Sequence, residues 1–307
     1  MQHNDNFNSS SRPKSSAFLN MQLVTPEHAS LFVYIKQAWL KYFSSKLSVQ
    51  DAADCEQFRA QMLYNHDEDK RITITQIYVG LSDVAYVTQL AVILETWHRT
   101  GINPLLTWLK ATEEENMVPS IEGVQLEFTS RQHVFKVCID TIHRFIDVVR
   151  NSNEENILRA TISLVDELGG SRGILTLLGF QQTRGSQNLA PLTLRQCLTA
   201  FTQRHTRQEP LTVGARAYSK HCVRCSSGWW GELKGNDFVK NERAEEKVRD
   251  LLSSATWKNI HSLPHANATM EVRNELGYGA RWDVITGAFR GLLEPPIVNG
   301  HEVKWRH

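Results

Sequence analysis

The chain has 307 residues, of which 41% are hydrophobic and 22% are charged, and its formal net charge is +1. This composition is ordinary for a globular protein and argues against wholesale disorder. A net charge close to zero gives no general electrostatic reason to expect nucleic acid or an acidic membrane as a partner. At roughly 150 residues a domain, the length predicts about two domains.

No stretch of the sequence approaches the roughly 20 consecutive apolar residues that a membrane-spanning helix needs. Residues 1–22 are rich in Ser and Asn and lack the apolar core of a secretory signal, so we expect a disordered tail. The cysteines number five, an odd count, and lie scattered along the chain. This pattern favours free thiols in a reducing compartment, and we expect the protein in the cytoplasm, the nucleus or both.

Residues 23–123 are predicted to be mostly helical. Ser48 stands in the spacing of a capping box and is expected to open the helix that carries Cys55. Residues 72–81 are rich in β-branched side chains, which favours a short strand within this region. Residues 112–123 combine acidic residues with Pro and Gly, and therefore predict a domain boundary.

A second unit is expected over residues 124–212. Apolar residues recur at three- and four-residue spacing between Phe135 and Val149, the pattern of a helix with one buried face. Residues 154–168 predict a second helix, which a pair of glycines ends. Residues 189–194 are expected to form a strand, and a closing helix follows it.

A third unit is expected over residues 213–307. Residues 236–255 predict a helix, and apolar and polar residues then alternate from Met270 to Val284, as in a strand with one buried face. With one strand before it and one after it, this segment predicts a three-stranded antiparallel sheet. Two helices covering one face of the sheet would make a two-layer αα-βββ domain. The whole chain is thus predicted to be α+β and mainly helical.

The middle of the chain shows a helix, an Arg–Asn turn, a second helix with a central arginine, an RG–LL–LGF segment, a strand and a helix. This order resembles the PUB domain, which occurs at the start of peptide:N-glycanase and in partners of the valosin-containing AAA ATPase. The resemblance spans residues 130 to 210 and implies a PUB-like α/β module. The matching residues are Arg150, Asn151, Asn153, Glu154, Arg159, Arg172, Gly173, Leu177, Gly179 and Phe180.

PUB domains bind an extended acidic or aromatic peptide, typically the C-terminal tail of that ATPase. Where the relatives hold the peptide with an asparagine and a tyrosine, this chain has Asp147 and Ile157 or Leu158. An aspartate repels an acidic tail, and an aliphatic side chain does not replace a tyrosine ring and hydroxyl. The resemblance thus carries the fold better than the binding. The peptide site that it implies consists of Asp147, Arg150, Asn151, Asn153, Ile157, Leu158, Arg159 and Arg172.

The C-terminal third carries the segments GYGARWD, FRGLLEPP and GHEVKWRH. These segments resemble the ending of an uncharacterised family of fungal and plant proteins. That resemblance implies no activity.

His221, Cys222 and Cys225 form the segment HCVRC, which comes nearest to a metal site. Structural zinc needs four ligands, usually from two pairs of this kind, and no second CxxC is present. Two inert cysteines on a helix are the favoured interpretation. Because no other cofactor motif is present, we expect neither a metal nor a cofactor.

Two alternatives involve the C-terminal third in chemistry or in RNA binding. Acid–base catalysis needs a histidine beside an orienting carboxylate. A cleft of that kind would combine His261, His265, Glu294, His301 and His307 with Trp282 and Trp305. Basic groups interleaved with aromatic ones on a sheet bind RNA, and the candidates are Arg273, Arg281, Arg290, Lys304 and Arg306 beside Tyr278. Glu271, Glu275 and Asp283 share the polar face of the alternating segment and argue against RNA.

Trp229 and Trp230 lie in a glycine-flanked loop. With Tyr278 and Trp282 they are candidate anchors for a partner protein, while packing over the edge of the sheet is an equally good interpretation. On balance we expect a non-enzymatic interaction protein whose partner is a protein or peptide. By analogy of fold alone, it would be an adaptor to the ubiquitin and AAA ATPase system. The sequence indicates no oligomeric state.

Overall fold

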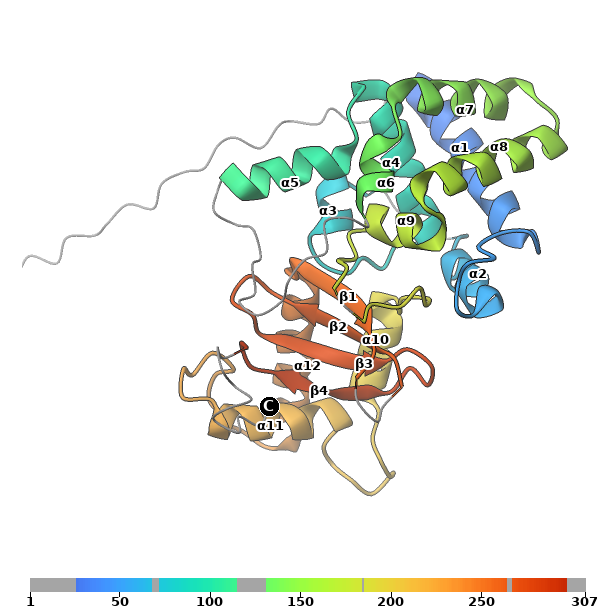
Figure 1. Cartoon of the computed structure of the whole chain (residues 1–307). Helices are drawn as coiled ribbons and strands as arrows, with labels where there is room; N and C mark the ends of the chain where they lie inside the picture. Colours follow the sequence, from blue (N-terminus) through green and yellow to red (C-terminus); the bar gives the residue numbers. More distant parts are fainter. Residues whose placement is uncertain (1–25, 68–71, 115–130, 184, 264–266, 297–307) are drawn as a thin grey trace, which may run out of the picture.

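The protein is described by a computed structural model over residues 26–67, 72–114, 131–183, 185–263 and 267–296 (Figure 1). These residues form a helical part and a part in which helices accompany an antiparallel sheet. The helical part consists of α1 (Pro26–Ser44), α2 (Cys55–Leu63), α3 (Ile74–Tyr78), α4 (Tyr86–Thr100), α5 (Pro104–Glu114), α6 (Gln132–Lys136), α7 (Ile139–Asn151), α8 (Glu154–Leu168) and α9 (Gly170–Leu177). The sheet part consists of α10 (Leu194–Thr202), α11 (Val213–Arg224), α12 (Asp237–Ser253), β1 (Trp257–His261), β2 (Thr269–Arg273), β3 (Gly279–Asp283) and β4 (Phe289–Leu293).

A hairpin of α7 and α8 forms as the sequence predicts, but its first helix begins only at Ile139, and Phe135 belongs to the separate short helix α6. Ile146 and Val149 are buried along one face of α7. The side chain of Asn153 accepts a hydrogen bond from the backbone N of Asn156 at 3.0 Å and so caps the first turn of α8. Gly169 ends α8 with φ at 92°, a left-handed conformation that glycine adopts at the least cost.

Three local expectations are wrong. The helix that carries Cys55 begins after Asp54, whose carboxylate accepts from the backbone N of Gln57 at 2.9 Å, whereas Ser48 donates to a nearby carbonyl. Residues 74–78 form the short helix α3 and not a strand. Residues 189–194 form no strand either: Thr193 is the N-cap of α10 in a complete capping box, and Leu194 is the first residue of that helix.

The sheet has four strands within the described residues, in the order β1-β2-β3-β4, and not the three that the sequence predicts. The alternating segment is divided into β2 and β3 by a tight turn. Arg273 pairs with Gly279, and Glu271 with Arg281, so odd-numbered residues oppose odd-numbered residues. Because side chains alternate between faces at each residue, this register keeps the same parity on the same face through the turn. A hairpin of this register therefore has the sequence pattern of one long strand.

Helices α10, α11 and α12 pack against one face of the sheet (Figure 1). Met270, Val272 and Trp282 are fully buried on that face. The indole Nε1 of Trp282 donates to the carbonyl of Cys197 on α10 at 3.1 Å, which ties the sheet to that helix. The opposite face carries polar and charged side chains, among them Glu271, Arg273 and Arg281.

The helical part is joined to the sheet part at β1. Lys258 of β1 is buried, and its Nζ donates to the carbonyl oxygens of Ile77, Gly80 and Leu178 at 2.8, 3.0 and 3.1 Å. These carbonyls lie at the C-terminal ends of α3 and α9, where backbone acceptors lack partners within the helix and the helix dipole favours a cation. Burial lowers the pKa of the amine to about 7. Both its charged and its neutral form are N–H donors near neutral pH.

A second junction involves the loop after α3. The backbone N of Gly80 donates to the carbonyl of Ala255 at 2.5 Å, and that of Leu81 donates to Leu252 at 2.8 Å. A Cβ atom on Gly80 would lie 2.3 Å from the carbonyl oxygen of Ser253, so only glycine fits there. The two parts of the chain are therefore in close backbone contact.

Residues 1–22, for which the sequence predicts a disordered tail, lie outside the described residues. None of the described helices has the length and apolar character needed to cross a membrane.

Candidate functional site

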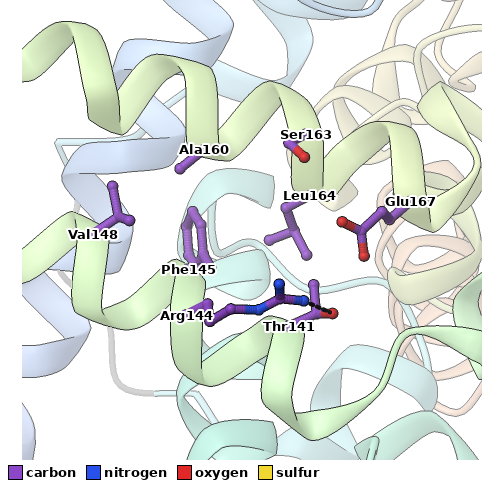
Figure 2. A pocket seen from close by; sticks show the side chains of 8 residues that line it. All are labelled: Thr141, Arg144, Phe145, Val148, Ala160, Ser163, Leu164 and Glu167. Carbon is purple, nitrogen blue, oxygen red and sulfur yellow. Dashed lines mark hydrogen bonds between the residues drawn. The ribbon is translucent and has the colours of Figure 1, made fainter.

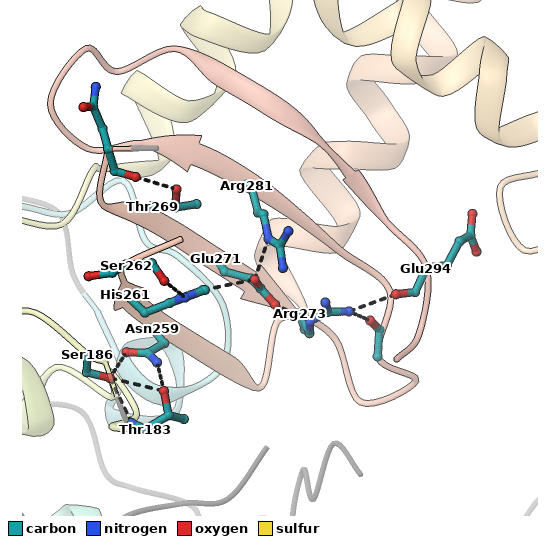
Figure 3. Close-up of polar contacts among 12 residues, drawn as sticks. Thr183, Ser186, Asn259, His261, Ser262, Thr269, Glu271, Arg273, Arg281 and Glu294 are labelled. Carbon is teal, nitrogen blue, oxygen red and sulfur yellow. Dashed lines mark hydrogen bonds and ion pairs between the residues drawn. The ribbon is translucent and has the colours of Figure 1, made fainter. Parts of the chain in front are cut away.

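The face of the sheet opposite α10, α11 and α12 carries polar and charged side chains (Figure 3). The register places Asn259, Glu271 and Arg281 side by side across β1, β2 and β3. His261 lies on the same face, two residues after Asn259 on β1. Arg273 also lies on this face, two residues after Glu271 on β2. Because β1 and β2 are antiparallel, His261 and Arg273 lie toward opposite ends of the strands. Five polar side chains are thus grouped around the middle of the sheet.

Three side chains converge on the carboxylate of Glu271. His261 Nε2 lies 3.2 Å from Oε2, and Arg281 Nε donates to the same oxygen at 2.6 Å. Arg273 Nε donates to Oε1 at 2.5 Å. The side chain of Glu271 is 5% exposed, whereas those of His261 and Arg281 are 16% and 21% exposed. A molecule approaching this face therefore meets the imidazole and one guanidinium first, with the carboxylate beneath them.

The charge state of Glu271 follows from these contacts. Burial raises the pKa of its carboxyl group, but the hydrogen bond from His261 and the charges of Arg273 and Arg281 outweigh burial. Together they hold the pKa of Glu271 well below its usual value of 4.5. The group is therefore a carboxylate at neutral and mildly acidic pH.

The two arginines are held differently. Arg273 is buried, and its Nη1 also donates to the backbone carbonyls of Gly277 and, at 3.0 Å, of Glu294. Arg281 is bound through Nε, and its two terminal nitrogens make no hydrogen bond to any described residue. Two adjacent N–H groups of a guanidinium match two oxygens of a phosphate. Arg273 is thus an anchored part of the sheet, and Arg281 is available to an anion.

A neutral cluster of Thr183, Ser186 and Asn259 adjoins Glu271 on the side away from Arg281 (Figure 3). Ser186 Oγ donates to Asn259 Oδ1 at 2.9 Å, and Asn259 Nδ2 donates to Thr183 Oγ1 at 2.9 Å. The backbone N of Thr183 donates to Ser186 Oγ at 2.9 Å. Asn259 is fully buried, whereas Thr183 and Ser186 are half-buried.

This grouping suits chemistry at a phosphate ester. An imidazole in contact with a carboxylate forms a pair that can accept one proton and donate another. A guanidinium beside that pair stabilises negative charge as it develops on oxygen. The neutral cluster adds hydroxyl groups that both donate and accept hydrogen bonds.

A second histidine–carboxylate pair lies at the end of α11. Glu294 Oε1 accepts from His221 Nδ1 at 2.7 Å and from Trp230 Nε1 at 2.8 Å, and Glu294 Oε2 accepts from Cys225 Sγ at 3.2 Å. Cys222 Sγ donates a hydrogen bond to the carbonyl oxygen of Trp230 at 3.7 Å. Both oxygens of Glu294 are therefore held by fixed donors, and this pair joins α11 and the tryptophan loop to the segment after β4. No group of three His, Cys, Asp or Glu side chains in the described residues is arranged to hold a metal ion.

Residues 201–294 match the CdiA C-terminal tRNase toxin domain. The match begins in α10 and ends after β4, so it includes His261, Glu271 and Arg281. It covers under a third of the chain. No curated protein and no solved structure matches the chain.

The toxin match overturns the interpretation of the chain as a PUB-containing adaptor. A tRNase toxin domain points to a nuclease, and nothing connects the chain to a PUB domain, an AAA ATPase or the ubiquitin system. The match also replaces the resemblance of the C-terminal third to an uncharacterised fungal and plant family. Of the alternatives left open by the sequence, an enzyme in the C-terminal third agrees best with the match.

The side chains predicted to hold a peptide on α7 and α8 have local roles. Asn151 Nδ2 donates to the carbonyl of Asp147 at 3.1 Å, and Arg159 pairs with Glu155 one turn away on α8. A pocket of about 170 Å³ between the two helices is lined by other residues (Figure 2). These residues are Thr141, Arg144, Phe145, Val148, Ala160, Ser163, Leu164 and Glu167. Among the residues of the predicted peptide site, Arg150 is exposed, Ile157 and Leu158 pack partly buried against the core, and Arg172 is buried in α9.

The predicted partner anchors are mostly in the core. Trp230 and Trp282 are fully buried, and Tyr278 is 7% exposed. Trp229 is half-buried and stacks on Tyr278 with ring centroids 4.1 Å apart, while Lys247 Nζ lies 3.7 Å from its ring. Both faces of Trp229 are thus occupied, and packing over the sheet is the correct alternative for the tryptophan loop.

The pairing of the predicted cleft is wrong. In the expected cleft His261 and Glu294 lie together, but in the structure His261 contacts Glu271, and Glu294 contacts His221. The alternating segment is the signal from which the correct grouping could have been found. When that segment is folded as a hairpin, Glu271, Arg273 and Arg281 share one face of the sheet. The remaining candidates lie outside the described residues: His265, His301, Lys304, Trp305, Arg306 and His307.

Proposed function

We propose that the polar face of the sheet cleaves RNA at a phosphodiester bond. The observation that carries this proposal is the contact of His261 with Glu271 beside Arg281, whose terminal nitrogens are free of described partners. All three residues lie in the segment that matches a tRNase toxin domain, which makes transfer RNA the first substrate to test.

The proposed reaction uses the ribose of the substrate. The 2′ oxygen attacks the adjacent phosphorus, and the bond from phosphorus to the 5′ oxygen of the next nucleotide breaks. The proton of the 2′ hydroxyl passes to Glu271, and protonated His261 gives its proton to the departing 5′ oxygen. The products are a 2′,3′-cyclic phosphate and a 5′ hydroxyl. The contact between Glu271 and His261 then lets the proton return.

Substrate binding itself would activate the carboxylate. In the free protein, Arg281 is one of the cations that hold the pKa of Glu271 low. A phosphate bound at the terminal nitrogens of Arg281 neutralises part of its charge, so Glu271 loses part of that stabilisation and becomes a stronger base.

Replacement of Arg281 tests this proposal. We expect the full chain to cut unfractionated transfer RNA into fragments with 2′,3′-cyclic phosphate ends, and to leave DNA of the same length intact. Arg281→Gln should lower kcat/KM by about 100-fold, since a side chain that stabilises charge in the transition state typically contributes that much. The measurement is the initial rate of cleavage at fixed ionic strength.

Arg249→Gln is the matched control, because Arg249 is an exposed arginine on α12 that pairs with Glu245. It should cleave at the wild-type rate. Intact transfer RNA after incubation with the wild-type chain, or an unchanged rate in Arg281→Gln, would count against the proposed function.

A further inference from the structure

Residues 181–183 and 185–187 precede the segment that matches the toxin domain, yet they extend the candidate site. The backbone N of Gln187 donates to the carbonyl of Ile260 at 2.9 Å, and that of Ser262 donates to Gly185 at 3.1 Å. Ser186 is thereby bridged to His261 in antiparallel pairing on the edge of β1 that β2 does not occupy. The polar face thus continues beyond β1 into residues from the helical side of the chain.

The hydrogen bonds of this edge direct Ser186 toward the site. The backbone hydrogen bonds of Gly185 and Gln187 lie on either side of the bridge between Ser186 and His261. Ser186 and His261 are therefore a non-hydrogen-bonded pair of the antiparallel ladder. The side chains of such a pair stand on the same face of a sheet, close together. The contact of Ser186 Oγ with Asn259, two residues before His261, agrees with that orientation.

Arg172 of α9 holds the same segment through hydrogen bonds to Gln187 and Asn188. Its Nε donates to Asn188 Oδ1 at 2.8 Å, and its Nη2 donates to the carbonyl of Gln187 at 2.7 Å. Arg172 is 8% exposed, so these are buried, charge-assisted hydrogen bonds. Thr183 and Ser186 are consequently held in place by the helical part as well as by β1.

From this geometry we infer that Thr183, Ser186 and Asn259 form a subsite for the base of the nucleotide next to the scissile phosphate. The inference rests on the proposed function. Glu271 separates the neutral cluster from Arg281, so a phosphate at Arg281 places the adjoining nucleoside over the cluster. Neutral groups that donate and accept suit the edge of a base, whereas the cations suit its phosphate.

Asn259 acts as a positioning residue in this subsite. It is fully buried, and its amide holds both hydroxyl groups, one through Oδ1 and one through Nδ2. The half-buried hydroxyls of Thr183 and Ser186 are the groups that contact the base. Because their orientation is set before the substrate arrives, they can discriminate between bases with different donor and acceptor patterns.

The test is the base preference of cleavage in a random-sequence RNA, measured by sequencing the fragment ends. We expect the wild-type chain to prefer one base beside the cut. In Ser186→Ala and Thr183→Val, the ratio between the best and the worst base should fall about threefold or more, the usual effect of one hydrogen bond. Thr183→Ser keeps the hydroxyl and should keep the preference. Ser219→Ala, which removes a hydroxyl on α11 bonded only to its own helix, is the matched control.

The outcomes separate this inference from the proposed function. If the wild-type chain cuts no RNA, the proposed function fails and the subsite fails with it. If the wild-type chain cuts RNA with no base preference, or if the two variants slow cleavage at all four bases equally, the nuclease stands and the subsite is overturned. Equal circular dichroism spectra and melting temperatures of the variants and wild type show that a lost preference does not come from unfolding.

Discussion

His261→Ala should lower the rate of RNA cleavage by about 10²- to 10⁴-fold, the range that a positioned acid or base contributes. The imidazole is in contact with Glu271 at 3.2 Å and is partly exposed, so it can reach a departing oxygen of the substrate. Its removal takes away the proton donor but leaves Arg281 and the sheet in place. The fall should therefore appear in kcat, with KM little changed.

His205→Ala serves as the control for this substitution, because His205 is exposed in the turn after α10 and lies within the same matched segment. It should cleave at the wild-type rate.

Glu271→Gln should reduce the rate as well, and it leaves Arg273 and Arg281 without the carboxylate that they share. Full activity in His261→Ala would remove His261 from the reaction and move attention to the His221–Glu294 pair.

Lys258→Met should destabilise the protein by on the order of 3 kcal/mol, because it leaves several buried carbonyl groups without a donor. The acceptors are those of Ile77, Gly80 and Leu178, all within 3.1 Å of Nζ. Methionine fills a similar volume but donates no hydrogen bond, so the loss reports on the polar contacts rather than on a cavity. The measurement is the free energy of unfolding from urea titration. Lys220→Met, at an exposed position of α11, should change it by less than about 0.5 kcal/mol.

The destabilisation should also depend on pH in a defined direction. Burial lowers the pKa of Lys258 from 10.5 to about 7, so between these values the unfolded chain binds more protons at this residue than the folded chain. Stability from Lys258 therefore rises as the pH increases from about 7 toward 10.5. The difference in unfolding free energy between wild type and Lys258→Met should be larger at pH 9 than at pH 6. A difference that stays constant or shrinks with rising pH would show that the pKa of the buried amine is not lowered.

Several local features were determined by the sequence alone. The sequence predicted helices over residues 154–168 and 236–255, which are α8 and α12, and Asn236 caps α12 by accepting from the backbone N of Val239. Periodicity and capping involve residues within a few positions of each other, so neighbouring residues suffice to specify them. The alternation of the C-terminal third likewise identified a polar face that carries Glu271, Arg273 and Arg281. The acidic members of this face argue against RNA binding from the sequence alone, since the sequence does not show that Arg273 and Arg281 bind Glu271.

The candidate site was decided by tertiary structure. His261 contacts Glu271 rather than Glu294 because the register of β1 with β2 places them on one face, and register depends on pairing between distant residues. The match of residues 201–294 to the tRNase toxin domain overturned the PUB-based prediction of function, which rested on capped helices in the middle of the chain. Ser186 reaches the site from a loop that no motif distinguishes, because Arg172 and β1 hold it there.

The exposure of a side chain was also beyond the sequence. Tryptophan is a residue type that often anchors a partner, yet Trp230 and Trp282 are buried. Lysine is usually a surface residue, yet Lys258 is buried between two helix ends. Burial of a side chain depends on which segments pack over it, and those segments are far away in the sequence. Local pattern thus determined the helices and the alternation of the strands, and tertiary packing decided which charges meet.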